Sequence, residues 1–205
     1  MLEPPELDRQ IGMTVYLSLT PGIGGRIRRR IEDFVVEEIL RNGSKASVAL
    51  PGNVSIGGSG SHLYCLLVKQ GWDTLILIEE IAKQLGVDPR VVKIAGIKDA
   101  RALTAQHISI RGVDPNAILR VRIKDARLIP LYYSREPINS SSLLGNFFKI
   151  VITDFKNPIK KAYEVVQETR SELNSHGGMP NFFSYQRFGT VRPITHIVGR
   201  YIVMG

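Results

Sequence analysis

Short apolar runs, each bounded by Gly, Pro or charged residues, make up most of the pattern of this chain. Three stretches have the spacing of amphipathic helices, namely 75–85, 158–173 and 193–203. Alternating, β-branched or short apolar runs typical of strands are more frequent, at 26–40, 62–69, 91–97, 106–111, 121–133 and 146–153. Strands outnumber helices and do not alternate strictly with them, which predicts an α+β fold with a mixed, mainly antiparallel sheet flanked by helices.

Gly, Pro and Asp residues mark where these elements begin and end. Asp73 or Thr74 can cap the helix that starts near 75, and Gly86 closes it. Residues 1–25 and the Gly- and Ser-rich segment 51–61 are predicted to be irregular. The glycines within 22–25 follow no strand pattern and precede no Lys-Ser/Thr pair, so we expect a plain turn there and not a phosphate loop.

Composition excludes several classes of protein. With 205 residues of which 43% are hydrophobic, the chain can bury a core and is not intrinsically disordered. A single cysteine, Cys65, cannot form an internal disulfide or a cysteine-rich metal site. No apolar stretch approaches 18 residues, and the acidic, proline-containing start is unlike a secretory leader. We therefore expect a soluble, cytoplasmic protein with no membrane association.

The positive charge of the chain is concentrated in one region. The formal net charge is +8, and the window 90–135 contains ten basic but only three acidic side chains. Such clustering favours a surface that binds a polyanion, with nucleic acid as the leading candidate. A second basic cluster at 26–30 is short and is followed by Glu32 and Asp33, so we interpret it as an exposed strand edge and not as a binding arm.

The stretch 95–106 carries the best candidate for chemistry. An apolar run ends at Gly96, and Lys98 and Asp99 follow where a strand is expected to give way to a turn. Lys98 and Arg101 are cationic neighbours in sequence that would favour the ionised form of Asp99. An ionised carboxylate in a basic region suits a nucleophile or base, but the same Asp could simply cap the turn through a backbone N–H. The residues alone leave both interpretations open.

Four segments of the chain carry motifs in a fixed order. They are Asp-Phe-Val-Val-Glu-Glu at 33–38, Ala-Gly-Ile-Lys-Asp-Ala-Arg-Ala-Leu-Thr-Ala-Gln at 95–106, Gly-Asn-Phe-Phe at 145–148 and Pro-Asn-Phe-Phe-Ser-Tyr-Gln-Arg-Phe-Gly at 180–189. Together they resemble the motifs of an archaeal-type member of the TruD family of tRNA pseudouridine synthases. Ser184 departs from the pattern, because the family usually has Gly at this position.

The resemblance implies a fold, a reaction and a partner. The fold would be that of the pseudouridine synthases. The reaction would convert a uridine of tRNA, with uridine-13 in the D-arm as the expected target, to pseudouridine. The target base is flipped, the C1′–N1 bond breaks, and the uracil turns and rejoins the sugar through C5. The family uses no cofactor and no metal, and we expect a monomer that binds tRNA.

The resemblance also implies roles for single residues. Asp99 would be the catalytic carboxylate, acting either on the sugar or as a base beside it. Lys98 would lie near this carboxylate and neutralise it, and Asn146 would bind the base or order the Asp99 loop. Phe148 would stack on the flipped uracil. On periodicity alone Phe147 and Phe148 are typical core residues, and we expect at least one of them to be buried.

Further residues of the motifs complete the expected site. Glu38 matches an acidic position of the family and would pair with Lys98 or Arg187. Arg101 and Gln106 belong to the same motif as Asp99, and the pocket wall would be formed by Gln186, Arg187 and Phe188. A purely structural role for these last three residues is the alternative.

The length of the chain affects the expected activity. Residues 1–190 would be the N-terminal part of the catalytic domain, and 191–205 would approach a domain that the family inserts there. One alternative is therefore an RNA-binding fragment without turnover. Another is an α+β enzyme that acts on a small anionic metabolite and has no affinity for tRNA.

Overall fold

The computed structural model describes residues 3–52, 55–189 and 192–205, apart from the side chain of Gln186. The chain divides into two compact units. Unit 1 combines Met1–Gly25 with Asp154–Gly205, and unit 2 is Arg26–Thr153. The expected domain boundary at 190–191 falls on residues outside the described ranges, and it stays a prediction. Each unit is described by itself below.

A seven-stranded sheet forms unit 2, with the strand order β2-β6-β3-β5-β1-β7 and with β4 paired to β5. The β1–β5 and β2–β6 pairs are parallel and the other pairs are antiparallel. The predicted α+β fold with a mixed, mainly antiparallel sheet is confirmed. The strands are β1 Phe34–Leu40, β2 Gly57–Gly58, β3 His62–Gln70, β4 Val92–Ile94, β5 Leu103–Arg111, β6 Ala126–Ser134 and β7 Leu143–Ile150.

The apolar run of β3 occupies the middle of the sheet. Its side chains alternate between two faces, so that Leu63 and Leu67 pack with the helix α2, Thr74–Leu85, whereas Leu66 and Val68 pack with Ala46 on the other side. All the buried hydrophobic clusters among the described residues lie within unit 2. A strand that is buried on both faces explains why this run is continuous and not alternating.

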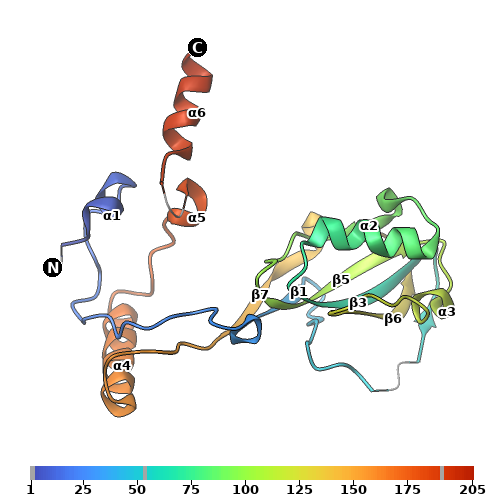
Figure 1. Cartoon of the computed structure of the whole chain (residues 1–205), viewed down its shortest axis with the longest axis horizontal. Coiled ribbons are helices and arrows are strands. Elements are labelled where there is room, and N and C mark those ends of the chain that lie inside the picture. The colour runs from blue at the N-terminus through green and yellow to red at the C-terminus, as the bar shows by residue number, and fades with distance from the viewer. Residues whose placement is uncertain (1–2, 53–54, 190–191) are drawn as a thin grey trace. The chain divides into compact units, whose positions relative to one another are not determined.

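The helix α2, Thr74–Leu85, covers one face of this sheet (Figure 1). The carboxylate of Asp73 caps it by accepting hydrogen bonds from the backbone N–H groups of Leu75 at 2.8 Å and Ile76 at 3.2 Å. Gly86 ends the helix in the left-handed conformation, with φ of 67°. Both predicted ends are present, because each depends on local chemistry.

Several strands differ from the predicted ranges by a few residues. The strand expected at 121–133 begins only at Ala126, since Asp125 turns the chain with φ of 57°. β5 begins three residues before the predicted 106, and β7 occupies 143–150 where 146–153 was predicted. The shorter elements of unit 2 are the 3₁₀ turns η1 Ile31–Asp33, η2 Pro89–Val91 and η3 Ser140–Ser142 and the helix α3 Pro115–Ile118.

Unit 1 consists of helices and extended segments. Its helices are α1 Glu6–Gln10, α4 Ile159–Ser175, α5 Tyr185–Phe188 and α6 Thr195–Met204. Glu172 of α4 holds the N-terminal segment by accepting hydrogen bonds from the Ser18 hydroxyl at 2.6 Å and the Leu19 N–H at 2.8 Å. The predicted irregularity of 1–25 is wrong for α1. Across the described ranges, no helix is both long enough and apolar enough to span a bilayer.

Candidate active site

Asp99 lies in the turn between β4 and β5, and its carboxylate pairs with an arginine. The Arg28 Nη2 donates to Asp99 Oδ1 at 2.9 Å. Both side chains remain about one-third exposed, at 31% for Arg28 and 35% for Asp99. Asp99 is therefore anchored by one cation while it stays accessible to a ligand.

Arg28 owes its position to an unusual backbone conformation and to an aromatic ring. Its φ of 58° is left-handed, which is uncommon for a residue other than glycine. Its guanidinium carbon lies 3.8 Å from the centroid of the Phe34 ring, in a cation–π contact. Arg101 Nη2 donates to the Arg28 carbonyl oxygen at 3.2 Å and so supports the same turn.

The structure thus changes the expected electrostatics of Asp99. Lys98 and Arg101 were expected to supply the nearby positive charge, because they are its neighbours in sequence. Lys98 instead turns to Glu38, and Arg101 contacts the Arg28 backbone. The interpretation of 26–30 as an exposed strand edge is wrong for Arg28, which is a functional candidate that the sequence alone did not indicate. The density of arginine within 26–30 was the local signal that could have pointed to it.

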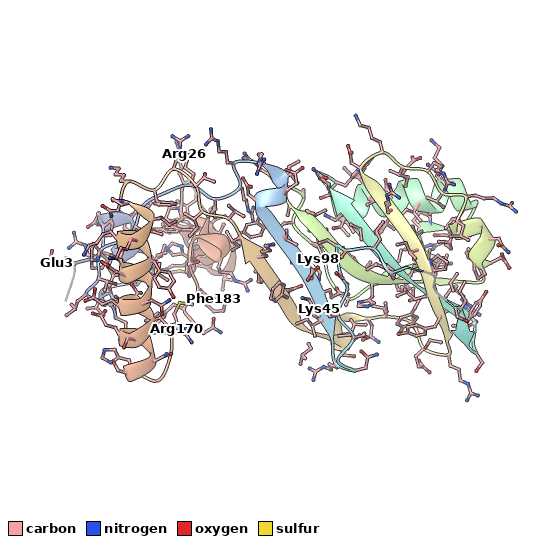
Figure 2. The ribbon with its side chains drawn as sticks, turned by 90° about the horizontal axis from the view of Figure 1, so that it is seen from below. Glu3, Arg26, Lys45, Lys98, Arg170 and Phe183 are labelled. Carbon is pink, nitrogen blue, oxygen red and sulfur yellow. The ribbon has the colours of Figure 1, made fainter. Side chains whose placement is uncertain are left out.

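Glu38 and Lys98 form a buried ion pair. Lys98 Nζ lies 2.8 Å from Glu38 Oε2, and both side chains are almost completely buried. The other oxygen of Glu38 accepts a hydrogen bond from the backbone N–H of His107 at 2.9 Å and lies 3.3 Å from Nδ1 of that ring. Of the two partners that were expected for Glu38, Lys98 is the one in contact. Figure 2 shows Lys98 beside β1, the strand that carries Glu38.

Burial and these contacts act on the pKa of Glu38 in opposite directions. Burial alone raises it, but the contacts with His107 and Lys98 more than compensate, so the pKa lies below its ordinary value. Glu38 is therefore the ionised partner of Lys98. The neighbouring residue Glu37 forms a second ion pair, with its Oε2 atom 2.7 Å from Lys45 Nζ. Burial alone raises the pKa of Glu37, but the contacts with Lys45 and with the Val48 N–H more than compensate, so the pKa of Glu37 is also lowered.

The aromatic residues of β7 are exposed, contrary to the expectation that at least one is buried. Phe148 is 49% exposed and Phe147 is 44% exposed. The reason is that β7 is an edge strand, paired along one side with β1. The Phe148 ring packs edge-on against Phe34 at 6.0 Å between centroids, and Lys45 Nζ lies 3.7 Å from the centroid of Phe147. The Phe34 ring also contacts the Arg28 guanidinium, which in turn pairs with Asp99, so a series of contacts links Phe148 to Asp99.

The backbone that carries Asp99 is held by two residues that sequence reasoning did not single out for this purpose. The Lys69 Nζ donates to the Asp99 carbonyl oxygen at 2.9 Å and lies 3.4 Å from that of Lys98. The Thr74 hydroxyl lies 3.1 Å from the same Lys98 carbonyl oxygen and accepts from the Lys98 N–H at 3.2 Å. These contacts join β3, the start of α2 and the Asp99 turn.

The other predicted residues divide between the two units. Asn146 pairs with Glu38 in the β1–β7 register, and its side chain is exposed. Gln106 is buried, and its Nε2 donates to the Gly96 carbonyl oxygen at 3.4 Å. The helix α5 in unit 1 contains Gln186, Arg187 and Phe188, and the Phe188 ring packs edge-on against His196. Their relation to Asp99 stays a prediction.

His, Cys, Asp and Glu side chains are the usual protein ligands of metal ions. In the ranges that the structure describes, no group of three or more of them is arranged to hold a metal ion. Burial raises the pKa of the Cys65 thiol, and this side chain lies inside the core of unit 2.

Comparison with known proteins identifies the family to which the chain belongs. The sequence profile of the family described as "tRNA pseudouridine synthase D (TruD)" matches residues 10–205. The chain belongs to this family. The resemblance seen in the four motifs is thereby confirmed over nearly the whole chain.

Individual relatives support the same assignment. Proteins named as tRNA pseudouridine synthase D are 39% identical over 204 residues in Methanosarcina barkeri and 39% identical over 197 residues in Archaeoglobus fulgidus, covering 100% and 96% of this chain. The crystal structure of a Methanosarcina mazei protein described as TruD matches all of this chain with a TM-score of 0.85 and 39% identity. In all three cases, this chain spans 44% of the length of the other protein.

Proposed function

We propose that this chain contributes the catalytic aspartate of a tRNA pseudouridine synthase, with Asp99 as the reacting carboxylate and uridine-13 of the D-arm as the target. The observation that carries the proposal is the environment of Asp99. It is a partly exposed carboxylate that accepts a hydrogen bond from Arg28 at 2.9 Å, and it belongs to the segment 95–106, whose sequence resembles a motif of the family. An anchored but accessible carboxylate is what attack on a sugar or proton abstraction beside it requires.

The exposed ring of Phe148 gives the flipped base a surface. A uracil that leaves the stack of an RNA helix loses the attraction of its neighbours, and an exposed aromatic ring can replace it. The link from Phe148 through Phe34 to Arg28 relates this ring to the carboxylate. During the proposed reaction the C1′–N1 bond breaks, the uracil turns and the C1′–C5 bond forms. C5 then loses its proton and N1 gains one, so that the product is an isomer of the substrate. We propose that no cofactor or metal takes part.

The distribution of charge supports tRNA as the partner. Of the ten basic residues in 90–135, Lys98 is buried and paired, and the other nine are exposed. Arg122, Lys124 and Arg127 line a groove of about 930 Å³ beside β6. Exposed Lys and Arg side chains along a groove suit the phosphate backbone of RNA.

The test is the release of tritium from C5-labelled uridine in tRNA. Asp99→Asn is expected to abolish release while tRNA binding in a gel-shift titration is retained. Asp154→Asn is the matched control, because Asp154 is exposed, belongs to unit 1 and has a left-handed φ of 55° that suits asparagine equally well. Release that is unchanged in Asp99→Asn would contradict the role of Asp99.

Two other outcomes separate the alternatives. Binding of tRNA without release by the wild-type protein would support a non-catalytic RNA-binding role. Absence of tRNA binding even at low salt would support an enzyme for a small anionic metabolite. Mapping the modified nucleotide in the product then tests whether uridine-13 is the target.

A further inference from the structure

Lys69 is a fully buried lysine in the middle of the sheet of unit 2. It lies on β3, directly between Thr104 of β5 and Ala126 of β6 in the strand register. Lysine is rarely buried to this extent, since removing an ammonium group from water costs several kcal/mol unless it is well hydrogen-bonded. Its retention at this position calls for a compensating set of contacts.

The contacts of Lys69 are backbone carbonyl groups. Its Nζ lies 2.8 Å from the Trp72 carbonyl oxygen, 2.9 Å from that of Asp99 and 3.4 Å from that of Lys98. An ammonium group has three N–H donors, so these three oxygens use its full capacity. Two of them belong to the dipeptide that carries the Asp99 carboxylate.

Thr74 completes the attachment of this dipeptide. Its hydroxyl accepts from the N–H of Lys98 at 3.2 Å and is 3.1 Å from the carbonyl oxygen of the same residue. Because Thr74 is the first residue of α2, the Asp99 turn is fixed to both the sheet and the helix. A carboxylate that must act on one atom of a substrate benefits from a backbone that is fixed in this way.

We propose that Lys69 is a positioning residue for the reaction of Asp99. Its buried ammonium group fixes the Lys98–Asp99 backbone and places a positive charge near the Asp99 carboxylate. This inference rests on the proposed function of Asp99 but goes beyond it. Lys69 does not touch the substrate. It acts through the turn, with Thr74 as its partner on the helix.

The charge of Lys69 gives the proposal a signature in pH. Burial lowers the pKa of Lys69 to about 8, the nearby charges of Asp73 and Asp99 raise it in part, and Lys98 lowers it further. The charged amine therefore predominates at neutral pH and is lost as the pH rises through about 8. Deprotonation removes one of the three donors and the positive charge together.

The first experiment compares Lys69→Met with Lys83→Met, an exposed position on α2, in the full-length natural protein. At saturating tRNA, the rate of tritium release is expected to fall about 100-fold in Lys69→Met, the usual effect of a displaced catalytic group, and to be unchanged in the control. The affinity for tRNA should stay within about twofold. A rate in Lys69→Met equal to that of wild type would overturn the proposal. So would a loss of tRNA affinity as large as the loss of rate.

The second experiment measures the rate from pH 6 to pH 10. The wild-type rate is expected to fall above pH about 8, and Asp73→Asn, which keeps a capping side chain, should shift this fall to lower pH because a negative charge near Lys69 is lost. A profile that is the same in both proteins would overturn the role of the charge. This variant keeps the proposal testable if Lys69→Met does not fold.

Amide hydrogen exchange separates this inference from the proposed function. The N–H of Lys98 should exchange faster in Thr74→Val than in wild type, and Thr74→Ser should restore the protection, because it keeps the hydroxyl. In Lys69→Met the exchange of the Asp99 turn should also rise. Unaltered exchange would overturn the inference, whereas a wild-type protein that releases no tritium would overturn the proposed function alone.

Discussion

The guanidinium of Arg28 and the carboxylate of Asp99 lie 71 positions apart in the sequence and 2.9 Å apart in space. Both groups are about one-third exposed, and a pair in such a position adds only about 0–1 kcal/mol to the free energy of unfolding. The pair is therefore better suited to orienting Asp99 than to holding the fold together.

Replacing Arg28 should reveal this difference. Arg28→Ala is expected to lower the rate of tritium release about 100-fold, the lower end of the loss caused by removing one preorganised hydrogen-bond donor from an active site. Arg28→Lys should recover part of the loss, since it keeps the charge without the planar fork. The free energy of unfolding, measured in urea, should change by less than about 1 kcal/mol.

Arg9→Ala serves as the control, because Arg9 pairs with Glu6 at the surface and lies outside the basic window 90–135. This control should leave the rate of tritium release and the free energy of unfolding unchanged. A loss of stability in Arg28→Ala that accounts for the loss of rate would argue against an orienting role.

Unlike the Arg28–Asp99 pair, the Glu38–Lys98 pair should contribute strongly to the free energy of unfolding. Their side chains are buried, so Glu38→Gln leaves an ammonium group without its counter-charge and should cost about 3–5 kcal/mol of unfolding free energy. The double variant Glu38→Gln, Lys98→Met should recover much of that cost. Urea unfolding at pH 7 measures the free energy of unfolding of the single and the double variant.

The effect of Glu38→Gln on the free energy of unfolding should depend on pH. The pKa of Glu38 is lowered in the folded state, so its contribution is complete above the ordinary glutamate pKa of about 4.3 and is lost as the pH falls through the folded value. The difference in stability between wild type and Glu38→Gln should therefore shrink on acidification. A difference that is constant from pH 7 to pH 3 would contradict this assignment.

At the scale of elements, α2 links the core to the candidate site. Its N-terminus carries the Asp73 cap and Thr74, which contacts the Lys98 peptide. Asp73→Ala should lower the free energy of unfolding by about 0.5–2 kcal/mol, whereas Asp73→Ser should retain most of it. Thermal unfolding of the two variants checks this, and equal destabilisation by Ala and Ser would show that the cap is not the cause.

The elements also show what the sequence could predict. The helix at 75–85 and the buried strand at 62–69 follow from spacing and caps, which are local properties. The edge position of β7 is a property of the whole sheet, and for this reason Phe147 and Phe148 were wrongly predicted to include a core residue. Local pattern specifies that a strand is apolar but not which strands lie beside it.

The candidate site was predictable in part for the same reason. Family motifs pointed to Asp99, Lys98 and Glu38, and proximity in sequence suggested that Lys98 neutralises Asp99. The structure pairs Lys98 with Glu38 and Asp99 with Arg28, because the parallel pairing of β1 with β5 brings distant residues together. The roles of Lys69 and Thr74 depend on long-range packing that no local pattern specifies.

At the scale of the whole molecule, the positive charge is unevenly distributed along the chain. The net charge of +8 arises largely from 90–135, and the exposed members of that window belong to unit 2. Unit 2 also contains the candidate site. The basic side chains that we propose to bind RNA and the carboxylate that we propose to act on it thus belong to the same compact unit.

Removing charge from the groove should weaken tRNA binding in a salt-dependent way. The triple variant Arg122→Ala, Lys124→Ala, Arg127→Ala is expected to lower affinity and to reduce the slope of log K against log salt by about one for each phosphate that is no longer neutralised. The control, Lys160→Ala with Lys161→Ala, changes exposed residues of unit 1. Equal slopes for the two variants and wild type would exclude the groove from RNA binding.

The place of β1 in the sheet has a consequence for how the chain folds during synthesis. β1 is made early but lies between β5 and β7, both of which come later in the sequence. The ribosome needs about 3–12 seconds to proceed from the end of β1 to the start of β5. Until then β1 lacks its partner strand β5, so we expect the charged side chains of Glu37 and Glu38 to remain hydrated. The acidic pair that later becomes buried beside the site would thus first protect the nascent chain from premature association.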